Sequence, residues 1–300
     1  MTQAVSRKAL RQHPLPQPDG DADKEERGRV VIVAGSRFVP GAGLLSGTAA
    51  LRAGAGKLQL AVPTSLAIAS GIALPEAGMI ALPEDGDGNI EASAASALHQ
   101  PIARADAVLI GPGITDTESC AALTRAVLES VESSFVLDAG ALSKLMEHKD
   151  AVRRQNARVV LTPHAGEMAA LLKLDKRQIA AQPQFYARQV ARELHCVVVL
   201  KGATTHIADA DGTLWRHDCD AVGLGTAGSG DVLAGIIVGL LARGATPLGA
   251  ALWGVQVHGK IGEKLARNIG RLGYLARDLL EQIPLVLSAI EKDTAKAKQR

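Results

Sequence analysis

Residues 225–231, called the anion turn below, combine residue types that suit the binding of a negatively charged group. They read Gly-Thr-Ala-Gly-Ser-Gly-Asp and lead directly into the apolar stretch 232–241, which indicates a helix. The glycines allow successive backbone amides to converge, and the N-terminus of a helix adds the positive end of its dipole. Such an arrangement suits a phosphate oxygen or a developing anion. Asp231 would be repelled by bound phosphate unless it serves as a base or a magnesium partner, although it would equally suit an ordinary helix start.

Two better-known glycine motifs fit the chain less well. Residues 223–228 have the spacing of a dinucleotide-binding fingerprint, but no acidic residue follows Asp231 until Glu263, so the expected ribose partner is missing. Residues 254–260 nearly match a P-loop, but Ile261 replaces the Ser or Thr that would hold magnesium, and the stretch has helical character. We interpret both matches as accidental.

Three further groups of polar residues each follow an apolar run. Asp138 is typical of an acidic loop or a helix cap, and Thr162 is predicted to cap a helix that has Glu167 near its first turn. A lone histidine such as His164 at a helix start is more often structural than functional. Residues 201–205 (Lys-Gly-Ala-Thr-Thr) could form a tight turn or embrace a nucleotide. Each group taken alone leaves the structural interpretation open.

The apolar runs are too short for helices and predict buried strands. These strands are expected at 30–34, 58–62, 107–110, 135–137, 158–161 and 196–200. Helices rich in small residues are expected at about 41–54 and from about 229 and 247, and a hairpin is expected from 204–208 and 213–216. Strands that alternate with helices imply crossover connections, a mostly parallel sheet and ligands at the carboxyl ends of the strands.

Residues 1–28 are polar or charged and contain three prolines, so we predict a flexible N-terminal segment. The remainder shows no internal repeat and no interdomain linker. Residues 29–300 are therefore predicted to form a single α/β domain, a size that such folds reach undivided.

The composition excludes several classes of function. Thirty-three basic and 31 acidic residues give a net charge of +2, which offers no field for nucleic acid or for a membrane surface. The three cysteines are scattered, as is usual in a reducing cytosol, and no run of about 18 apolar residues could span a membrane. With no apolar leader at the N-terminus either, we expect a cytoplasmic protein.

Taken together, the motifs resemble one family. The chain resembles the ADP-dependent NAD(P)H-hydrate dehydratases of the ribokinase-like superfamily over residues 30–284. The resemblance is carried, in chain order, by Val33-Ala-Gly-Ser36 with Pro40-Gly-Ala42, Gly111-Pro-Gly113, Leu137-Asp-Ala-Gly-Ala-Leu142, Leu161-Thr-Pro-His164 with Gly166-Glu167, Lys201-Gly202 and Gly228-Ser-Gly-Asp231. Gly-Ser-Gly-Asp alone indicates only the superfamily.

The resemblance implies a three-layer α/β/α ribokinase-like sandwich with a mostly parallel central sheet, assembled as a homotetramer. It implies that (6S)-NAD(P)H hydrate and ADP react to give NAD(P)H, AMP and phosphate, with Mg²⁺ as cofactor and no ligand set assigned to it. In the larger relatives an N-terminal domain is an epimerase; here we expect a separate epimerase to act in the same pathway.

The resemblance also assigns residues to roles. Asp231 would be the catalytic base. The hydrate would be bound by Ala42, Gly113, His164 and Asp231. The adenine nucleotide would be bound by Lys201, Gly202, Ala203, Thr204, Thr205 and Gly230. The charge on the phosphoryl group would be held by the amides of Ala227, Gly228, Ser229 and Gly230.

The chain departs from the family pattern in four places. Residues 25–28 replace the usual His-Lys-Gly, Val39 replaces a Tyr, Ala221 falls near the place of an Asn, and Ala227 replaces a Gly. Two other functions use the same residues. One is an ATP-dependent kinase for a vitamin precursor, such as a hydroxyethylthiazole or pyridoxal. The other is a non-catalytic nucleotide sensor, which would have no need of a base at Asp231.

Overall fold

A single ten-stranded sheet forms the centre of the molecule in the computed structural model of the chain, which describes residues 2–17, 27–115 and 117–296. The strand order is β1-β10-β9-β8-β7-β6-β5-β2-β3-β4. All neighbours are parallel except β9, which is antiparallel to both β8 and β10. The strands are β1 (Thr2–Ala4), β2 (Arg29–Val33), β3 (Lys57–Pro63), β4 (Ala77–Leu82), β5 (Ala107–Ile110), β6 (Ser134–Leu137), β7 (Val159–Leu161), β8 (Val197–Leu200), β9 (Thr204–Ala208) and β10 (Leu214–Asp218).

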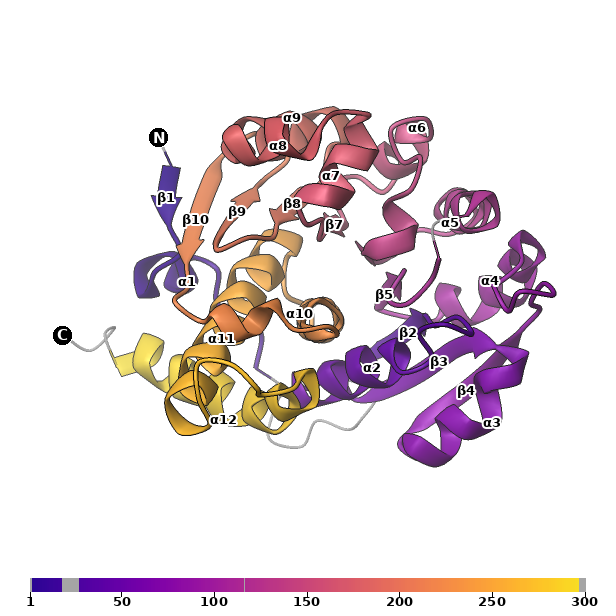
Figure 1. The fold of residues 1–300 in the computed structure, drawn as a ribbon, viewed down its shortest axis with the longest axis horizontal. Helices are drawn as coiled ribbons and strands as arrows, with labels where there is room; N and C mark the ends of the chain where they lie inside the picture. Colours follow the sequence, from indigo (N-terminus) through magenta and orange to yellow (C-terminus); the bar gives the residue numbers. More distant parts are fainter. Residues whose placement is uncertain (1, 18–26, 116, 297–300) are drawn as a thin grey trace.

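Helices cover both faces of the sheet and complete the three layers (Figure 1). One face packs against α1 (Arg7–Gln12), α2 (Ala42–Arg52), α3 (Thr64–Ala73), α10 (Ser229–Ala242), α11 (Pro247–Asn268) and α12 (Ala276–Lys296). The other packs against α4 (Ala95–Ala103), α5 (Glu118–Ser130), α6 (Lys149–Arg153), α7 (Ala165–Leu172), α8 (Lys176–Ala181) and α9 (Pro183–Leu194). This architecture confirms the predicted α/β/α sandwich, the mostly parallel sheet and the hairpin.

Helix α10 is buried from Val232 to Ala242 and packs between α2 and α11, which fixes the position of the anion turn at its start (Figure 1). A helix that is apolar all round belongs in a core. Two glycines allow it to lie directly against α2: a Cβ atom on Gly235 would be 2.3 Å from the Ser46 carbonyl oxygen, and one on Gly239 would be 2.5 Å from that of Ala50. The small residues expected in these helices therefore set their close approach.

The prediction of a flexible segment over residues 1–28 is wrong for its first half. Strand β1 pairs in parallel with β10, and Leu10 of α1 is buried in the core. The indole Nε1 of Trp253 in α11 donates a hydrogen bond of 2.8 Å to the His13 carbonyl oxygen. These contacts arise from tertiary packing, which the local composition of the segment does not reveal. Residues 18–26 lie outside the described part of the chain.

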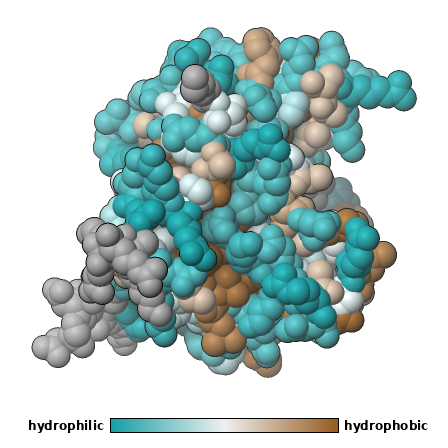
Figure 2. Space-filling model, turned by 90° about the vertical axis from the view of Figure 1, so that its left-hand side faces the viewer, coloured by the Kyte–Doolittle hydropathy of each residue, from teal (hydrophilic) through white to brown (hydrophobic). Residues whose placement is uncertain are grey.

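The surface on the side of β1, α1 and α12 is mostly hydrophilic, with hydrophobic residues gathered toward its lower part (Figure 2). Among the described residues, no helix has both the length and the apolar character that a membrane crossing requires.

Candidate active site

The loops after β2, β5 and β6 meet at the carboxyl edge of the sheet. A Cβ atom on Gly111, where φ is +124°, would lie only 1.7 Å from the Asp138 carbonyl oxygen, so the two loops touch through backbone. A Cβ atom on Gly113 would lie 2.6 Å from the Ala42 Cβ. Only glycine permits both close approaches. The structure thus brings Ala42 and Gly113, two of the residues assigned to the hydrate, into contact.

Lys201 lies at the centre of a buried polar network at this edge. Its Nζ donates to Asp138 Oδ1 at 2.9 Å and lies 3.8 Å from Glu167 Oε2. Thr162 Oγ1 donates to the same Asp138 oxygen at 2.8 Å. Burial lowers the pKa of Lys201, but the carboxylates of Asp138 and Glu167 outweigh it, so the net direction is upward. Lys201 is therefore a fixed positive charge at the edge of the sheet.

Helix α7 begins with a capping box formed by His164 and Glu167. His164 Nδ1 accepts from the Glu167 amide at 3.0 Å, and Glu167 Oε2 accepts from the His164 amide at 2.7 Å. The prediction that Thr162 caps this helix is therefore wrong, since its hydroxyl is used on Asp138. His164 also pairs with Lys201 in a parallel β-bridge, which holds the two residues side by side.

The anion turn has the backbone that its glycines predict. Gly228 is the N-cap of α10 with φ of +88°, which is the left-handed region that favours glycine. Among the described residues, the amides of Ala227, Gly228 and Gly230 have no acceptor, whereas the Ser229 amide donates to the Thr226 carbonyl oxygen at 3.3 Å. Three of the four expected amides are thus available to an anion, and the fourth is used within the turn.

The turn faces Lys201 directly. A Cβ atom on Gly230 would lie 3.3 Å from Lys201 Nζ, so the bare backbone of Gly230 and the ammonium group border the same small space. Amide donors from a helix start on one side and a lysine on the other suit a phosphate group.

Asp231 is next to this space and is surrounded by other carboxylates. Burial raises its pKa to about 7, the Asp138 and Glu167 carboxylates add to the rise, and the Lys201 ammonium opposes it. Its Oδ2 lies 3.9 Å from the position that a Cβ atom on Gly228 would take, and Leu45 of α2 lies 2.6 Å from that position. Asp231 is therefore close to the helix that begins with Ala42.

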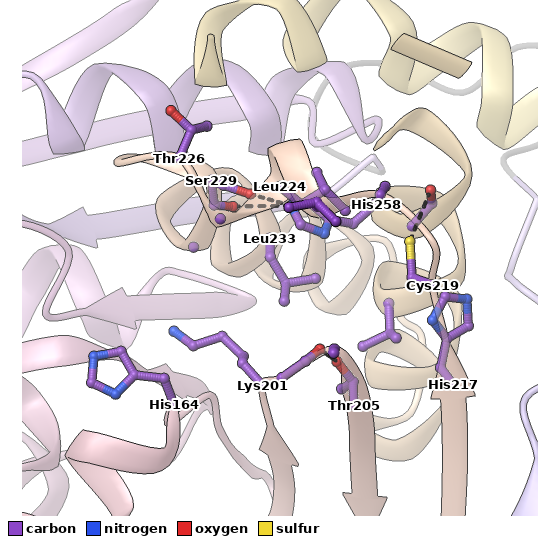
Figure 3. A pocket seen from close by; sticks show the side chains of 18 residues that line it. His164, Lys201, Thr205, His217, Cys219, Leu224, Thr226, Ser229, Leu233 and His258 are labelled. Carbon is purple, nitrogen blue, oxygen red and sulfur yellow. Dashed lines mark hydrogen bonds between the residues drawn. The ribbon is translucent and has the colours of Figure 1, made fainter. Parts of the chain in front are cut away.

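A cavity of about 560 Å³ opens on the other side of Lys201. Lys201 points across one end of it toward the start of α10, and His217 and Cys219 lie at the opposite end (Figure 3). Of the predicted site residues, the cavity is lined by His164, Lys201, Gly202, Ala203, Thr205, Ser229 and Gly230. The predicted residues that do not line it are Ala42, Gly113, Thr204, Ala227, Gly228 and Asp231.

Ala42, Gly113 and Asp231 lie near α2. His164, which was expected to bind the hydrate, instead lines the cavity together with residues assigned to the nucleotide, and four of residues 201–205 border it. Thr204 is the exception, because its hydroxyl donates to Asp218 Oδ1 at 2.7 Å.

Sequence reasoning missed much of the cavity wall. Val222, Leu224, Leu233 and Val255 give it an apolar lining that suits a nucleobase, and His258 of α11 reaches it from a stretch interpreted only as a failed P-loop. The helical character of that stretch is confirmed, since α11 includes it. An alternation of helix faces could have suggested that His258 points inward, but not that it meets the anion turn.

An amide-rich helix start beside a fixed lysine and an apolar cavity, at the carboxyl edge of a parallel sheet, defines a nucleotide-binding α/β protein. Comparison with known proteins narrows the class. The sequence profile of the NAD(P)H-hydrate dehydratases matches residues 30–285. The chain therefore belongs to the NAD(P)H-hydrate dehydratase family.

Individual relatives agree with this assignment. The chain is 48% identical over 288 residues to the ADP-dependent (S)-NAD(P)H-hydrate dehydratase of Xanthomonas campestris, covering 96% of this chain and 97% of that protein. It also matches bifunctional NAD(P)H-hydrate repair enzymes, one of them at 37% identity, and spans about half of their length.

Solved structures confirm the ribokinase-like fold. The ADP/ATP-dependent NAD(P)H-hydrate dehydratase of Bacillus subtilis, co-crystallised with ATP and Mg²⁺, superposes with a TM-score of 0.80 at 29% identity, covering 96% of this chain and 99% of that one. A ribokinase-like superfamily protein of Enterococcus faecalis superposes with a TM-score of 0.80 at 26% identity, covering 96% of each chain.

Proposed function

We propose that this chain catalyses the ADP-dependent dehydration of (6S)-NAD(P)H hydrate, giving NAD(P)H, AMP and phosphate. The observation that carries the proposal is Asp231, a carboxylate with its pKa raised to about 7, which lies in the first turn of α10 and close to Leu45 of α2, the helix that begins with Ala42. Family membership supports the same reaction.

The hydrate has a hydroxyl group on a carbon next to the ring nitrogen, and hydroxide is a poor leaving group. Asp231 accepts the proton of this hydroxyl while its oxygen attacks the β-phosphorus of ADP, and the bond to the α-phosphate oxygen breaks to release AMP. A base with a pKa near 7 is well matched to this task at neutral pH. The ring nitrogen lone pair then expels phosphate, and loss of a neighbouring proton restores the dihydropyridine.

The charge that gathers on the transferred phosphoryl group is held from two sides. The amides of Ala227, Gly228 and Gly230 point to it from the anion turn, and each such donor is worth about 3 kcal/mol in comparable anion holes. Lys201 lies on the other side of the phosphoryl group and contributes a positive charge, whose position is fixed by Asp138 and Glu167. The adenosine part of ADP extends into the cavity, where Gly202, Ala203, Thr205 and the apolar wall receive it.

Magnesium fits this site as a partner of the nucleotide. Among the described residues, no group of three or more His, Cys, Asp or Glu side chains could hold a metal ion alone. Mg²⁺ usually binds through substrate phosphates and one or two carboxylates. Asp138 and Glu167, which both face Lys201, would supply those carboxylates, and the ion would neutralise phosphate charge.

The recovery of NADH absorbance from hydrated NADH tests the proposal, with ADP, with ATP and without nucleotide. We expect recovery that needs nucleotide and that ADP supports at least as well as ATP. Stable phosphorylation of an added vitamin precursor without recovery of NADH would instead indicate a small-molecule kinase. Nucleotide binding without either reaction would indicate a sensor.

The proposal includes a homotetramer located in the cytoplasm. Sedimentation equilibrium of the purified protein tests the tetramer, and a mass of one or two chains would exclude it. Cell fractionation with a cytoplasmic enzyme as reference tests the location.

A further inference from the structure

His258 of α11 contacts the first residue of α10 inside the nucleotide cavity. Its Nε2 lies 2.9 Å from Ser229 Oγ and 3.1 Å from the Ser229 carbonyl oxygen (Figure 3). Both residues line the cavity, and Ser229 is only 3% exposed. The reaction described above gives neither side chain a part.

The Ser229 carbonyl favours one of the two neutral tautomers of His258. A carbonyl oxygen can only accept a hydrogen bond, so its contact with Nε2 is a hydrogen bond only in the tautomer that carries the proton on Nε2, which is the tautomer that the proposal below uses. Burial lowers the pKa of His258 to about 4, so the ring is neutral near pH 7 and only one of its two nitrogens carries a proton. With the proton on Nε2, Ser229 Oγ can only accept a hydrogen bond from this nitrogen, and the hydroxyl proton of Ser229 remains for another partner.

The hydroxyl is the only hydrogen-bond donor of Ser229 that is left for a phosphate, because its backbone groups already have partners. Its amide donates to the Thr226 carbonyl oxygen, and its carbonyl accepts from His258. Ser229 is the first residue of α10, it lies in the chain between Gly228 and Gly230, and it lines the cavity. A hydroxyl donor at this place suits a phosphate oxygen.

We propose that the Ser229 hydroxyl donates a hydrogen bond to a phosphate of the bound nucleotide and that His258 is the positioning residue that holds it in the donating orientation. The inference rests on the proposed function in taking the ligand to be ADP. It replaces the expectation that Ser229 contributes through its amide.

Calorimetric titration with ADP and Mg²⁺ tests the pair without any hydrate. Ser229→Ala should bind ADP about tenfold more weakly, which is typical for loss of one hydrogen bond to a charged group. His258→Asn should lose a similar factor, because its shorter amide does not reach Ser229. His258→Gln can place its amide nitrogen near the position of Nε2, so it should stay within about threefold of the wild type. The Asn and Gln variants thus form a matched pair.

The double variant Ser229→Ala/His258→Asn distinguishes this role from a general loss of packing. If His258 acts through Ser229, the double variant should bind ADP no more weakly than either single one, about tenfold below the wild type rather than about a hundredfold. Additive losses, ADP binding by Ser229→Ala equal to that of the wild type, or a Gln variant as weak as the Asn variant would each overturn the proposal. Thermal unfolding shows whether each variant is folded. If the His258 variants do not fold, the ADP affinity of a folded Ser229→Ala variant still tests the proposal.

A failure of this inference is separate from a failure of the proposed function. If ADP binds and NADH is recovered but the losses of ADP affinity in the two single variants add in the double variant, only the roles of Ser229 and His258 are wrong. If NADH is never recovered, the reaction is wrong whatever the binding data show.

Discussion

Asp231→Asn should stabilise the free protein and abolish its turnover, because the same carboxylate is costly to bury and essential as a base. Burial, together with Asp138 and Glu167, raises the pKa of Asp231 from 3.8 to about 7. The folded state therefore binds the proton more tightly than the unfolded state does. The ionised Asp231 carboxylate therefore lowers the free energy of unfolding. This loss is absent at low pH, grows from about pH 4 to pH 7 and is complete above pH 7.

The size of the stability gain follows from this difference. A pKa rise from 3.8 to about 7 corresponds to about 4 kcal/mol, and partial solvent screening reduces the gain to roughly 2–4 kcal/mol. For a chain of 300 residues this raises the Tm by about 3–6 °C. Scanning calorimetry without nucleotide should show the gain at about pH 8 and little difference at about pH 4. Turnover, measured as recovery of NADH, should fall by at least about a hundredfold, since only the proton acceptor is lost.

Asp209→Asn is the matched control. Burial is also the main cause that raises the pKa of Asp209, but this residue lies in the turn between β9 and β10 and not in the site. Its variant should keep turnover near that of the wild type. Activity of Asp231→Asn within a few-fold of the wild type would remove Asp231 from the proposed mechanism. A lower Tm for this variant at about pH 8 would refute the electrostatic argument.

Three further outcomes are expected. With saturating nucleotide, kcat/KM for the hydrate should rise about tenfold per pH unit below pH 7 and level off above it, since Asp231 acts deprotonated; a flat profile from pH 5 to 8 would contradict this role. ADP at about 100 times its Kd should raise the Tm of the wild type by about 4 °C. Gly230→Val should remain folded but lose this shift, whereas the control Gly86→Val, in an exposed loop, should keep it. Lys201→Met should weaken ADP binding by at least about tenfold, and unchanged binding in a titration would place the phosphates elsewhere.

The expected effect of Gly230→Val is steric and does not come from backbone strain. Within the anion turn the positive φ is at Gly228 and not at Gly230. Gly230 is in the first turn of α10, where valine is tolerated. The effect comes from the space, since its Cβ position is 3.3 Å from Lys201 Nζ.

The parallel core of the fold could be predicted from the sequence, because buried strands have continuous apolar runs. The run at 107–110 matches β5, and the helix expected from 247 matches α11. Strand β4 was missed because it lies at the edge of the sheet, half exposed, with a composition of Ala, Gly, Met, Ile and Leu that suits a helix equally well. Strand β1 was missed because three residues gain their structure only from pairing with β10.

The site was predictable where backbone determines it and less so where side chains meet across elements. Glycine spacing indicated the anion turn, and the parallel sheet implied that the groups at Asp138 and Lys201 would lie at one edge. That Asp138 fixes Lys201, rather than capping a helix, depends on two loops that are 63 residues apart in the chain. The contact of His258 with Ser229 depends on the packing of α10 against α11, which local sequence does not encode.

Phosphate accounting tests the central claim most directly. The wild-type protein is incubated with hydrated NADH, ADP and Mg²⁺, and NADH, AMP, inorganic phosphate and any organic phosphate ester are quantified by phosphorus NMR and chromatography. We predict NADH, AMP and inorganic phosphate in equal amounts, with no accumulated ester, because the ring nitrogen expels the phosphate that Asp231 helps to attach. A stable phosphorylated product, or NADH formed without AMP, would contradict the account.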